Sequence, residues 1–297
     1  MLDVAVIGGG IGGEHINGYA KLPERFRVTA VCDLNQDLAR NLAAQTGARS
    51  TADIDDVLAD PDIDIVDICL PPAMHVPVAI RVLETGKHAI VEKPVAGSLV
   101  EADQLIAAEA RSHGSLFPVF QYRYGKAFDQ LATLRAAGLP GRPVAATIET
   151  HWSRDKQYYA NLWRGSWNHE LGGAVLIHAI HAHDLLTQHF GAVADVAAVL
   201  TTNANPVETE DCAAISLRMA NGSLATSSIT LGAATDTTRL RFVYEHLTAE
   251  SGTAPYAPGI GEWRFTARNR DKQAKIDAIL QDVPDGLSGF AGYFDAI

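Results

Sequence analysis

Cysteine and methionine are both scarce, with three of each among the 297 residues. The cysteines, Cys32, Cys69 and Cys212, are odd in number, far apart and set within apolar runs. A disulfide framework uses an even number of cysteines at regular spacings, so this pattern is typical of buried, reduced thiols instead. We therefore expect a protein that works in a reducing compartment.

Long apolar runs are also missing. No segment approaches the roughly 20 apolar residues that a membrane-spanning helix needs. The first apolar run, Val4–Ile7, is too short for the core of a secretory signal peptide, and no basic segment precedes it. We expect a cytoplasmic protein that does not bind membranes.

Basic residues are fewer than acidic ones: 24 Lys and Arg against 35 Asp and Glu give a formal net charge of −11. An acidic surface of this size repels phosphate backbones and anionic lipids. We therefore expect a small-molecule substrate rather than nucleic acid. The 47% hydrophobic and 20% charged content is that of a globular protein, and the length predicts two domains.

Up to about residue 120, short apolar runs alternate with amphipathic stretches. The predicted strands are Val4–Ile7, Val28–Cys32, Ile65–Leu70, His88–Val91 and Leu116–Phe120. The predicted helices lie near 13–22, 35–46, 53–59, 75–85 and 98–113. Strands that are apolar on both faces and separated by helices indicate a parallel sheet covered on both sides. Right-handed crossovers then make residues 1–122 a doubly wound α/β domain of the Rossmann type.

Residues 123–297 follow a different pattern, with alternating strands and one long helix around 173–190. The predicted strands are Ala145–His151, Cys212–Met219, Ser223–Leu231 and Arg239–Tyr244. Asn221 and Gly222 form a plausible hairpin turn, since both tolerate a positive φ. We predict an α+β domain with a large, mainly antiparallel open sheet. Its uncovered face is expected to make a homodimer or homotetramer.

The chain ends inside a pattern. Gly289–Ile297 begins an apolar-periodic helix, with Phe290, Tyr293 and Phe294 on one side, and then stops. Helices rarely end in mid-pattern without a cap or a breaker. We therefore expect the second domain to be truncated relative to its natural relatives.

A glycine-rich loop follows the first predicted strand at once. It contains G-x-G-x-x-G as Gly8, Gly10 and Gly13. In a dinucleotide site the first glycine makes a tight turn, the second lets the backbone approach pyrophosphate, and the third packs helix on strand. A helix beginning near Gly12 would point its N–H groups at the phosphates. The expected cofactor contacts in this loop are Gly8, Gly10, Ile11, Gly12 and Gly13.

Asp33 ends the second predicted strand. Its carboxylate can accept hydrogen bonds from an adenosine ribose diol, but it would repel a 2′-phosphate. The next residue, Leu34, offers no charge to hold that phosphate, so NAD is expected rather than NADP. Asp33 could equally cap the helix Asn35–Thr46, and the two roles are compatible.

A lysine stands where the fourth predicted strand ends, in Glu92-Lys93-Pro94. Ligands of open parallel sheets bind beyond the carboxyl ends of the strands. A partly desolvated lysine there can exchange protons near neutral pH, although a lysine at a strand end is often only an edge residue. Further predicted cofactor contacts after the third and fourth strands are Leu70, Pro71, His75, Glu92 and Lys93. His75 could instead cap its own helix.

Histidines cluster on the predicted helix of the second half. At about 100° per residue, His181 and Asp184 share a face, His178 lies about 60° to the side and His183 points elsewhere. His181 could be a general acid or base that Asp184 orients. His178, His181 and Asp184 could instead bind zinc, but no His-Glu-x-x-His pattern appears and no metal is expected. Hydrogen-bonded core histidines are the third interpretation.

Taken in order, Gly8–Gly13, Glu92-Lys93-Pro94 and Gly172-Gly173 followed by His181-x-x-Asp184 make the chain similar to one known family. It resembles the glucose–fructose oxidoreductase / inositol dehydrogenase / MocA (Gfo/Idh/MocA) family over nearly its whole length. The resemblance implies a Rossmann domain, a C-terminal α/β domain whose open sheet forms oligomers, and NAD(P)-dependent oxidation of sugars, polyols or similar alcohols. It also implies that Lys93 and His181 are the catalytic lysine and histidine.

The chain departs from that family in two places. Members often have an acid four residues before the histidine, where this chain has Ile177. His178 lies beside that position and could substitute. Members also usually continue past Ile297 with a helix that returns to the Rossmann domain.

The mechanism expected from these residues is oxidation of a secondary alcohol. His181 would take the hydroxyl proton, Lys93 would stabilise the charge growing on the same oxygen, and Asp184 or His178 would orient the site. The expected substrate contacts are Lys93, Tyr158, Arg164, Trp167, His178 and His181. Aromatic faces and an arginine suit a sugar ring, although several residues of this stretch could be core.

The resemblance admits two other functions. One is a redox-neutral glycoside hydrolase that oxidises and re-reduces its sugar on a tightly held NAD. The other is a non-catalytic NAD-binding sensor.

Overall fold

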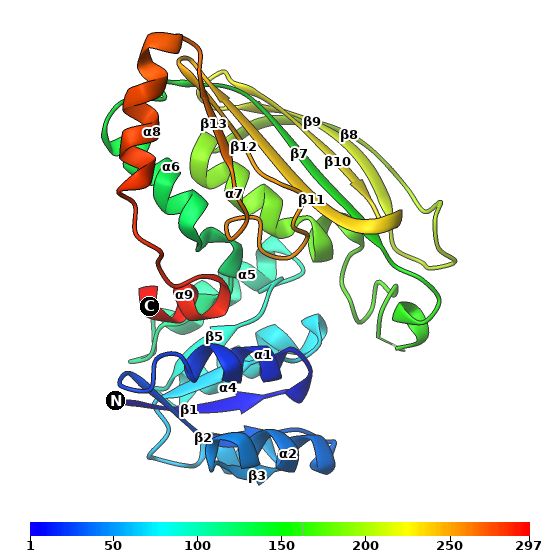
Figure 1. Ribbon diagram of the computed structural model, residues 1–297. Helices are drawn as coiled ribbons and strands as arrows, with labels where there is room; N and C mark the ends of the chain where they lie inside the picture. The colour runs from blue at the N-terminus through cyan, green and yellow to red at the C-terminus, as the bar shows by residue number, and fades with distance from the viewer. Residues whose placement is uncertain (162) are drawn as a thin grey trace. The chain divides into compact units, whose positions relative to one another are not determined.

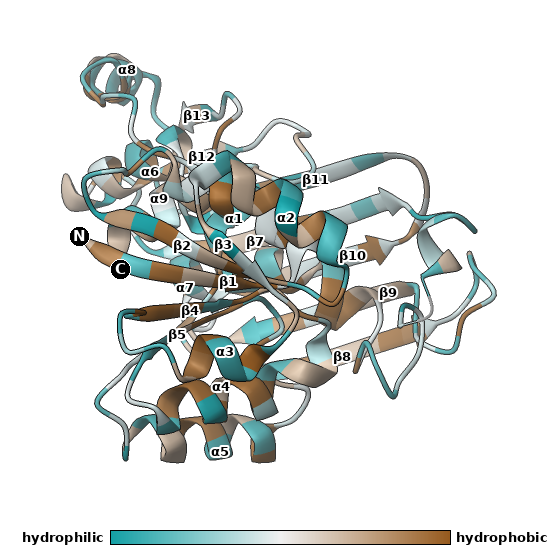
Figure 2. Ribbon diagram, turned by 90° about the horizontal axis from the view of Figure 1, so that it is seen from below, coloured by the Kyte–Doolittle hydropathy of each residue, from teal (hydrophilic) through white to brown (hydrophobic). Residues whose placement is uncertain are grey.

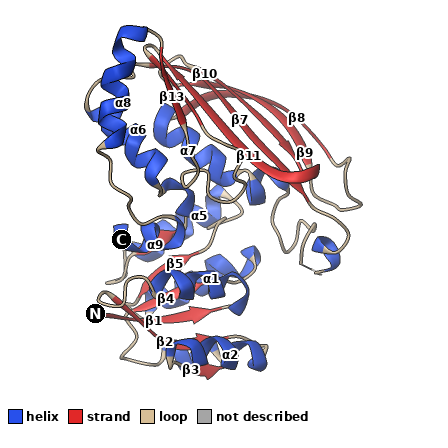
Figure 3. Cartoon of the chain, viewed as in Figure 1, coloured by secondary structure: helices blue, strands red, loops and turns tan. Residues whose placement is uncertain are grey.

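The computed structural model describes residues 1–161 and 163–297, which form two compact units. The six-stranded unit comprises Met1–Val119, Asn168–Leu171 and Tyr293–Ile297. The seven-stranded unit comprises Phe120–Trp167 and Gly172–Gly292. Both units mix helices and strands (Figure 3).

The six-stranded unit is built on a parallel sheet in the order β3-β2-β1-β4-β5-β6 (Figure 1). Its strands are β1 (Leu2–Ile7), β2 (Phe26–Cys32), β3 (Arg49–Thr51), β4 (Ile65–Ile68), β5 (His88–Val91) and β6 (Leu116–Pro118). Its helices are α1 (Gly9–Tyr19), α2 (Gln36–Thr46), α3 (Ile54–Leu58), α4 (His75–Glu84) and α5 (Leu99–Glu109), with a 3₁₀ turn at Pro72–Met74. This strand order is that of a doubly wound Rossmann sheet, which confirms the predicted fold.

Most strands of this sheet are largely apolar and buried. All four residues of β4 are buried; three of them are apolar and the fourth is Asp67, and much of the strand has the hydrophobic colour in Figure 2. Helix α4 buries Val78 and Val82 from its apolar side. The sequence prediction missed β3, because Arg49–Thr51 is polar and pairs only along one edge of the sheet.

The last helix, α9 (Gly289–Ala296), carries the chain back into the six-stranded unit. The Phe294 ring is fully buried and stacks on Tyr19 with 3.8 Å between ring centroids. Arg25 pairs with Asp295 at 2.8 Å between Nη1 and Oδ1. The predicted apolar-periodic helix is confirmed, and it is itself a helix that packs against the Rossmann unit.

The seven-stranded unit has the strand order β13-β12-β11-β7-β10-β9-β8. Its strands are β7 (Pro143–Ser153), β8 (Val193–Thr201), β9 (Cys212–Met219), β10 (Leu224–Thr230), β11 (Gly232–Tyr244), β12 (Leu247–Glu250) and β13 (Arg264–Ala267). Its helices are α6 (Lys126–Ala136), α7 (Ile180–Phe190) and α8 (Gln273–Gln281), a π-helical turn at Ala174–His178, and 3₁₀ turns at Gln121–Arg123, Tyr158–Ala160 and Arg270–Lys272. Every pair of neighbouring strands is antiparallel except β7 and β10, so the mainly antiparallel sheet is confirmed.

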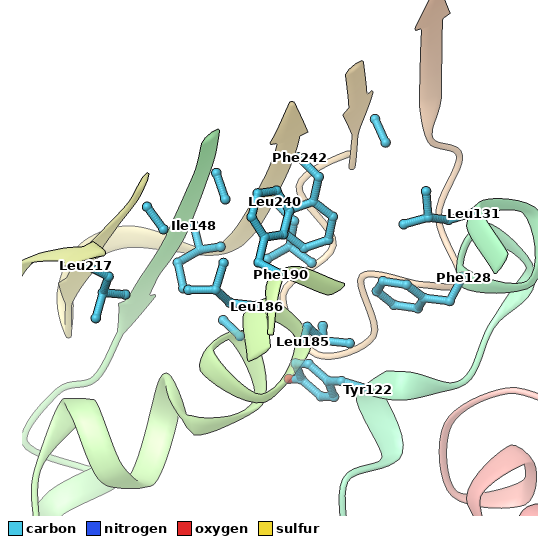
Figure 4. Close-up of a cluster of buried hydrophobic side chains, with 14 of the residues drawn as sticks. Tyr122, Phe128, Leu131, Ile148, Leu185, Leu186, Phe190, Leu217, Leu240 and Phe242 are labelled. Atoms are coloured by element: carbon cyan, nitrogen blue, oxygen red, sulfur yellow. The ribbon is translucent and has the colours of Figure 1, made fainter. Parts of the chain in front are cut away.

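Helix α7 covers one face of this sheet (Figure 4). Its Leu186 and Phe190 lie in one buried cluster with Ile148 of β7 and Phe242 of β11. The residues of β9 alternate between buried and exposed, so the other face of the sheet points away from this core. This is the periodicity that the sequence pattern indicated.

The long helix predicted around 173–190 is confirmed over Ile180–Phe190, but its first part is not α-helical. The chain forms a π-helical turn at Ala174–His178 and enters α7 only at Ile180. Glu210 anchors the start of this turn, because its backbone oxygen accepts the N–H of Ala174 at 2.8 Å and its carboxylate accepts that of Val175 at 3.1 Å. A π turn holds more residues than an α turn, so the helical wheel does not relate His178 to the residues of α7.

All three cysteines are free thiols, but Cys212 is only partly buried, because it opens the strand β9 where one face of the sheet is uncovered. Within residues 1–161 and 163–297, no helix combines the length and the apolar character needed to cross a bilayer.

We predict that Phe294→Ala weakens the six-stranded unit. Removing a fully buried ring from a closed aromatic cluster typically costs about 3–5 kcal/mol of the free energy of unfolding. Urea titration should show a lower midpoint for this variant. Leu99→Ala is the control, because that side chain is 84% exposed, and equal midpoints for both variants would contradict the packing.

Candidate functional site

The glycine loop lies between β1 and α1, where each glycine meets a different constraint. A Cβ on Gly8, which has φ of +95°, would lie 2.4 Å from the carbonyl oxygen of Cys69. A Cβ on Gly10 would meet nothing within 4 Å, so the backbone there is open to a ligand. The packing role predicted for Gly13 belongs to Gly12, whose Cβ would lie 2.8 Å from Val6 of β1. Gly13 makes only an ordinary contact with Leu42.

Helix α1 begins at Gly9, three residues before the position expected from the sequence. Its first turn therefore includes Gly10, Ile11 and Gly12, whose N–H groups have no intrahelical acceptor by helix geometry. The N-cap residue Gly8 offers no side chain to these groups, and no acidic residue lies in the first turn. Exposed N–H groups at the positive end of a helix are suited to a pyrophosphate group.

Asp33 follows β2 and lies beside this loop. One of its carboxylate oxygens accepts the N–H of Gly9 at 2.6 Å, and the other accepts the N–H of Asn35 at 2.7 Å. Asn35, not Asp33, is the residue that caps α2. A carboxylate held in this way keeps lone pairs for a ribose diol and brings negative charge to the place where a 2′-phosphate would lie.

The segment after β4 contains Leu70, Pro71 and His75, of which the first two are half-buried. The His75 ring is buried, with Nδ1 2.7 Å from the oxygen of Pro94 and Nε2 2.7 Å from the oxygen of Leu70. Burial is the main influence on this ring and lowers its pKa below the ordinary value. His75 thus links the segment after β4 to the Lys93-Pro94 segment through backbone oxygens.

Glu92 and Lys93 follow β5 at the same edge of the sheet. Glu92 is buried, and one of its carboxylate oxygens accepts the backbone N–H of Lys93 at 2.9 Å. Lys93 is half-buried. The six-stranded unit therefore gathers all the predicted cofactor residues at the carboxyl edge of its strands.

In the seven-stranded unit, His181 lies on α7 and is 3% exposed. Its ring stacks on Tyr122, with 4.1 Å between ring centroids, and meets the Phe120 ring edge-on at 5.9 Å. Asp184 pairs with Arg123, whose Nε lies 2.8 Å from the carboxylate. Among the described contacts, aromatic stacking holds the His181 ring, and the carboxylate of Asp184 faces a guanidinium.

His178 lies on the π-helical turn and contacts a different set of residues. Its Nε2 is 3.0 Å from the hydroxyl of Tyr158, and its ring meets Trp152 edge-on. The guanidinium of Arg164 lies over the Tyr158 ring at 4.0 Å. His178, Tyr158 and Arg164, all predicted substrate contacts, are thus in one cluster.

A cavity of about 500 Å³ lies in the same unit next to this cluster. It is lined by Tyr159, Arg164, Gly165, Ser166, Pro206, Val207 and Glu208. Trp167 is exposed and donates its indole N–H to the backbone oxygen of Glu208 at 3.1 Å. An arginine, a carboxylate and an aromatic ring can bind a polar ring compound here.

Two other histidines of α7 are the half-buried His183 and the buried His189. The Nε2 of His183 lies 3.0 Å from the Ser227 hydroxyl, and the Nδ1 of His189 lies 3.2 Å from Arg135. Burial lowers the pKa of His183 to about 4 and that of His189 to about 3, where the Arg135 charge adds to the effect. Both rings are neutral at physiological pH.

The spacing of His, Cys, Asp and Glu ligand atoms bears on whether the described residues could bind a metal. Among the described residues, His178, His181 and Asp184 form no metal-like group, whereas His15, Asp67 and Cys69 have ligand atoms within 4.8 Å of one another. The Nδ1 of His15 lies 2.8 Å from the Asp67 carboxylate, which is a hydrogen-bond distance. Two ligands about 2.0–2.1 Å from a tetrahedral zinc would lie farther apart than that. This group is a proton-sharing cluster.

Several residues of these sites were not identified from the sequence. Tyr122 stacks on His181, Arg123 pairs with Asp184, Glu210 bonds to the π turn before α7, and Asp67 pairs with His15. No local motif marks them, because each acts on a residue far away in the chain. The only hint in the sequence is the pair of adjacent acids Glu210 and Asp211, both of which are buried in the structure.

Comparison with known families identifies the chain. A family model described as "Oxidoreductase family, NAD-binding Rossmann fold" matches residues 2–120. A second model, the GFO/IDH/MocA C-terminal domain, matches residues 128–250. The chain therefore belongs to the Gfo/Idh/MocA family of NAD-binding oxidoreductases. This confirms the predicted family and cofactor.

Individual relatives are more distant. An uncharacterized oxidoreductase, YrbE, of Bacillus subtilis is 31% identical over 74% of this chain and 64% of its own length. Levoglucosan dehydrogenase of Pseudarthrobacter phenanthrenivorans is 31% identical over 68% of this chain and 54% of its own length. The chain thus spans less than two thirds of these relatives.

A solved structure agrees over a larger part of the chain. The WlbA dehydrogenase of Bordetella pertussis, crystallised with NADH and UDP-GlcNAcA, is similar to this chain with a TM-score of 0.83 and 28% identity. The match covers 95% of this chain and 82% of that one.

We predict that Asp33→Asn weakens NADH binding about tenfold or more, because hydrogen bonds to a charged group contribute about 1.5–3 kcal/mol. The same change should bring the dissociation constants of NADH and NADPH closer together, since it removes the charge that repels a 2′-phosphate. Fluorescence titration measures both constants. Asp37→Asn on α2 is the matched control, and an unchanged preference in the Asp33 variant would show that another residue selects the cofactor.

We also predict that His183 and His189 make the fold sensitive to acid. Their pKa values are lower in the folded than in the unfolded chain, so their contribution is complete above about pH 6.5 and is lost as the pH falls toward 4. Each lowers the free energy of unfolding by about 1.4 kcal/mol per pH unit in that range. His183→Gln should flatten the pH dependence of the urea midpoint, whereas the exposed-site variant His113→Gln should leave its slope unchanged. Equal slopes in all three proteins would contradict the neutral state of His183.

Proposed function

We propose that the protein is an NAD-dependent oxidoreductase that transfers a hydride between nicotinamide and a secondary alcohol or ketone of a sugar, polyol or related small molecule. The single observation that carries the proposal is the carboxyl edge of the six-stranded sheet. It combines the glycine-rich N-terminus of α1, the Asp33 carboxylate that accepts the N–H of Gly9, and Lys93 in a family of NAD-binding oxidoreductases.

The residues present fit the cofactor. The first-turn N–H groups of α1 suit the pyrophosphate, Asp33 suits the adenosine ribose, and Leu70, Pro71, His75 and Glu92 shape the edge nearer Lys93. Bound NAD would supply the hydride acceptor of the reaction at its nicotinamide ring. Because Leu34 is 90% exposed and adds no positive charge, NAD is favoured over NADP.

In the proposed mechanism Lys93 and His181 both act on the reacting hydroxyl. His181 removes the proton, and the Lys93 ammonium stabilises the negative charge that grows on the oxygen. Stacking on Tyr122 restrains the His181 ring. His178 and Asp184 are proposed to support the site, His178 through its contact with Tyr158 and Asp184 through its pair with Arg123.

A carbohydrate is the proposed substrate class. Tyr158, Arg164 and Trp167 offer aromatic faces and a cation, and Arg164 also lines the cavity of about 500 Å³. The names of relatives support the same class, since levoglucosan and UDP-GlcNAcA are both sugar derivatives.

We further propose that residues 1–122 are the dinucleotide-binding domain and that residues 123–297 bind substrate and associate into a homodimer or homotetramer through the open sheet. The exposed, alternating face of β9 and the exposed strand β8 support that use of the sheet. A cytoplasmic location is consistent with the three free thiols.

We predict that Lys93→Ala and His181→Ala each lower turnover by about 10²–10⁴-fold, the usual contribution of acid–base help. NADH binding should change by no more than about threefold, because other residues hold the adenosine and the pyrophosphate. A screen of sugars, polyols and inositols with NAD, read as absorbance of reduced cofactor, supplies the substrate for the assay. The exposed-site variants Lys21→Ala and His113→Ala serve as controls.

Three outcomes would contradict this function. Normal turnover in both variants would show that Lys93 and His181 are not catalytic. Cleavage of a nitrophenyl glycoside without net release of NADH would indicate a redox-neutral hydrolase. Absence of hydride transfer across the whole panel, with NADH still bound, would indicate a sensor.

A further inference from the structure

Two buried carboxylates in the six-stranded unit face opposite nitrogens of one histidine ring. His15 on α1 and Asp67 on β4 are both 0% exposed. The Nδ1 of His15 lies 2.8 Å from the Asp67 carboxylate, and its Nε2 lies 3.2 Å from the Glu92 carboxylate. Neither His15 nor Asp67 has a role in the mechanism described above.

This arrangement determines how many protons the His15 ring carries. A carboxylate only accepts hydrogen bonds, so a ring that bonds to two of them must carry a proton on each nitrogen. Burial is the largest single influence and opposes the positive charge, but the neighbouring groups, Asp67 foremost, together outweigh it and raise the pKa of His15 well above the ordinary value. The ring is therefore an imidazolium at neutral pH.

The other groups around the ring are consistent with this charge. The Tyr19 hydroxyl donates to the Asp67 carboxylate at 2.9 Å. The Cys69 sulfur lies 3.4 Å from Nδ1 of His15, and burial raises the pKa of this thiol to about 12, so it stays protonated. Phe294 of α9 meets the ring edge-on at 5.6 Å and helps to close the cluster to solvent.

The cluster continues to Lys93 through one side chain. The Glu92 oxygen that faces His15 is Oε1, while Oε2 accepts the backbone N–H of Lys93 at 2.9 Å. The position of the Glu92 carboxylate therefore sets the direction in which the backbone leaves β5, and so the point from which the Lys93 side chain starts.

We propose that His15 is a positioning residue for Lys93, which it places through Glu92 while Asp67 holds the ring from the other side. This inference rests on the proposed function, in which Lys93 contacts the reacting oxygen. A neutral ring has one N–H and can donate to only one of the two carboxylates. Loss of the second proton would thus remove the histidine donor from either Asp67 or Glu92 and leave that buried carboxylate with one hydrogen bond fewer.

The first test is His15→Gln, assayed with the substrate found in the screen. Turnover should fall about 10–100-fold, since a misplacement of about 1 Å at a catalytic group has costs of this order. The KM and the dissociation constant of NADH should stay within about threefold of the unaltered protein. When Lys93 is already alanine, adding His15→Gln should lower turnover no further. His113→Gln is the matched control.

The second test is the pH profile of Asp67→Asn, which keeps the shape of Asp67 and removes the charge that holds the His15 proton. The pKa of His15 should fall toward neutrality in this variant. Turnover should then decrease as the pH rises through that value, a step that is absent from the unaltered protein. A purely structural role of Asp67 would lower turnover equally at every pH.

The outcomes separate this inference from the function on which it rests. Normal turnover in Lys93→Ala would contradict the proposed mechanism itself. If Lys93→Ala is inactive, either of two results would overturn only the role of His15. These are unaltered turnover in His15→Gln and the absence of a new pH step in Asp67→Asn. If either variant does not fold, nitrogen NMR of the unaltered protein at about pH 8 measures the protonation of the histidine rings. Finding only neutral rings, and thus a neutral His15, would overturn the proposal.

Discussion

The site of this protein depends on one constraint, the shared carboxyl edge of a parallel sheet. Strand β1 lies in the middle of the order, so the loop after it has β2 on one side and β4 on the other. Gly8 allows the chain to turn there, because any side chain would strike the backbone of Cys69. The same edge gathers Asp33, Glu92 and Lys93 beside the loop. Without this close approach, residues that are distant in sequence would not form one nucleotide site.

The parts of the fold that could be predicted are those in which a local pattern and the burial agree. The apolar runs at Val4–Ile7 and His88–Val91 are strands because both of their faces are covered. Arg49–Thr51 is also a strand, but its polar residues give no such pattern. The helix expected around His178 begins with a π turn whose first N–H groups bond to Glu210 in a distant segment, and no helical wheel contains that information.

In the candidate site, too, residues marked by a local sequence pattern could be predicted, and their long-range partners could not. Glycine spacing, an aspartate after a strand and a lysine before proline are local signals, and they identified the nucleotide edge. The partners of these residues are long-range: Asp67 holds His15, Tyr122 stacks on His181 and Arg123 pairs with Asp184. Such pairs depend on the register of strands and helices. One local assignment also failed, since Gly12 rather than Gly13 packs against β1.

A crystal structure with bound NADH tests the nucleotide site most directly. We expect the pyrophosphate against the N–H groups of Gly10, Ile11 and Gly12, the adenosine ribose on the Asp33 carboxylate, and the nicotinamide beside Lys93. Electron density for NADH at another edge of the sheet, or a ribose away from Asp33, would contradict the site described for this protein.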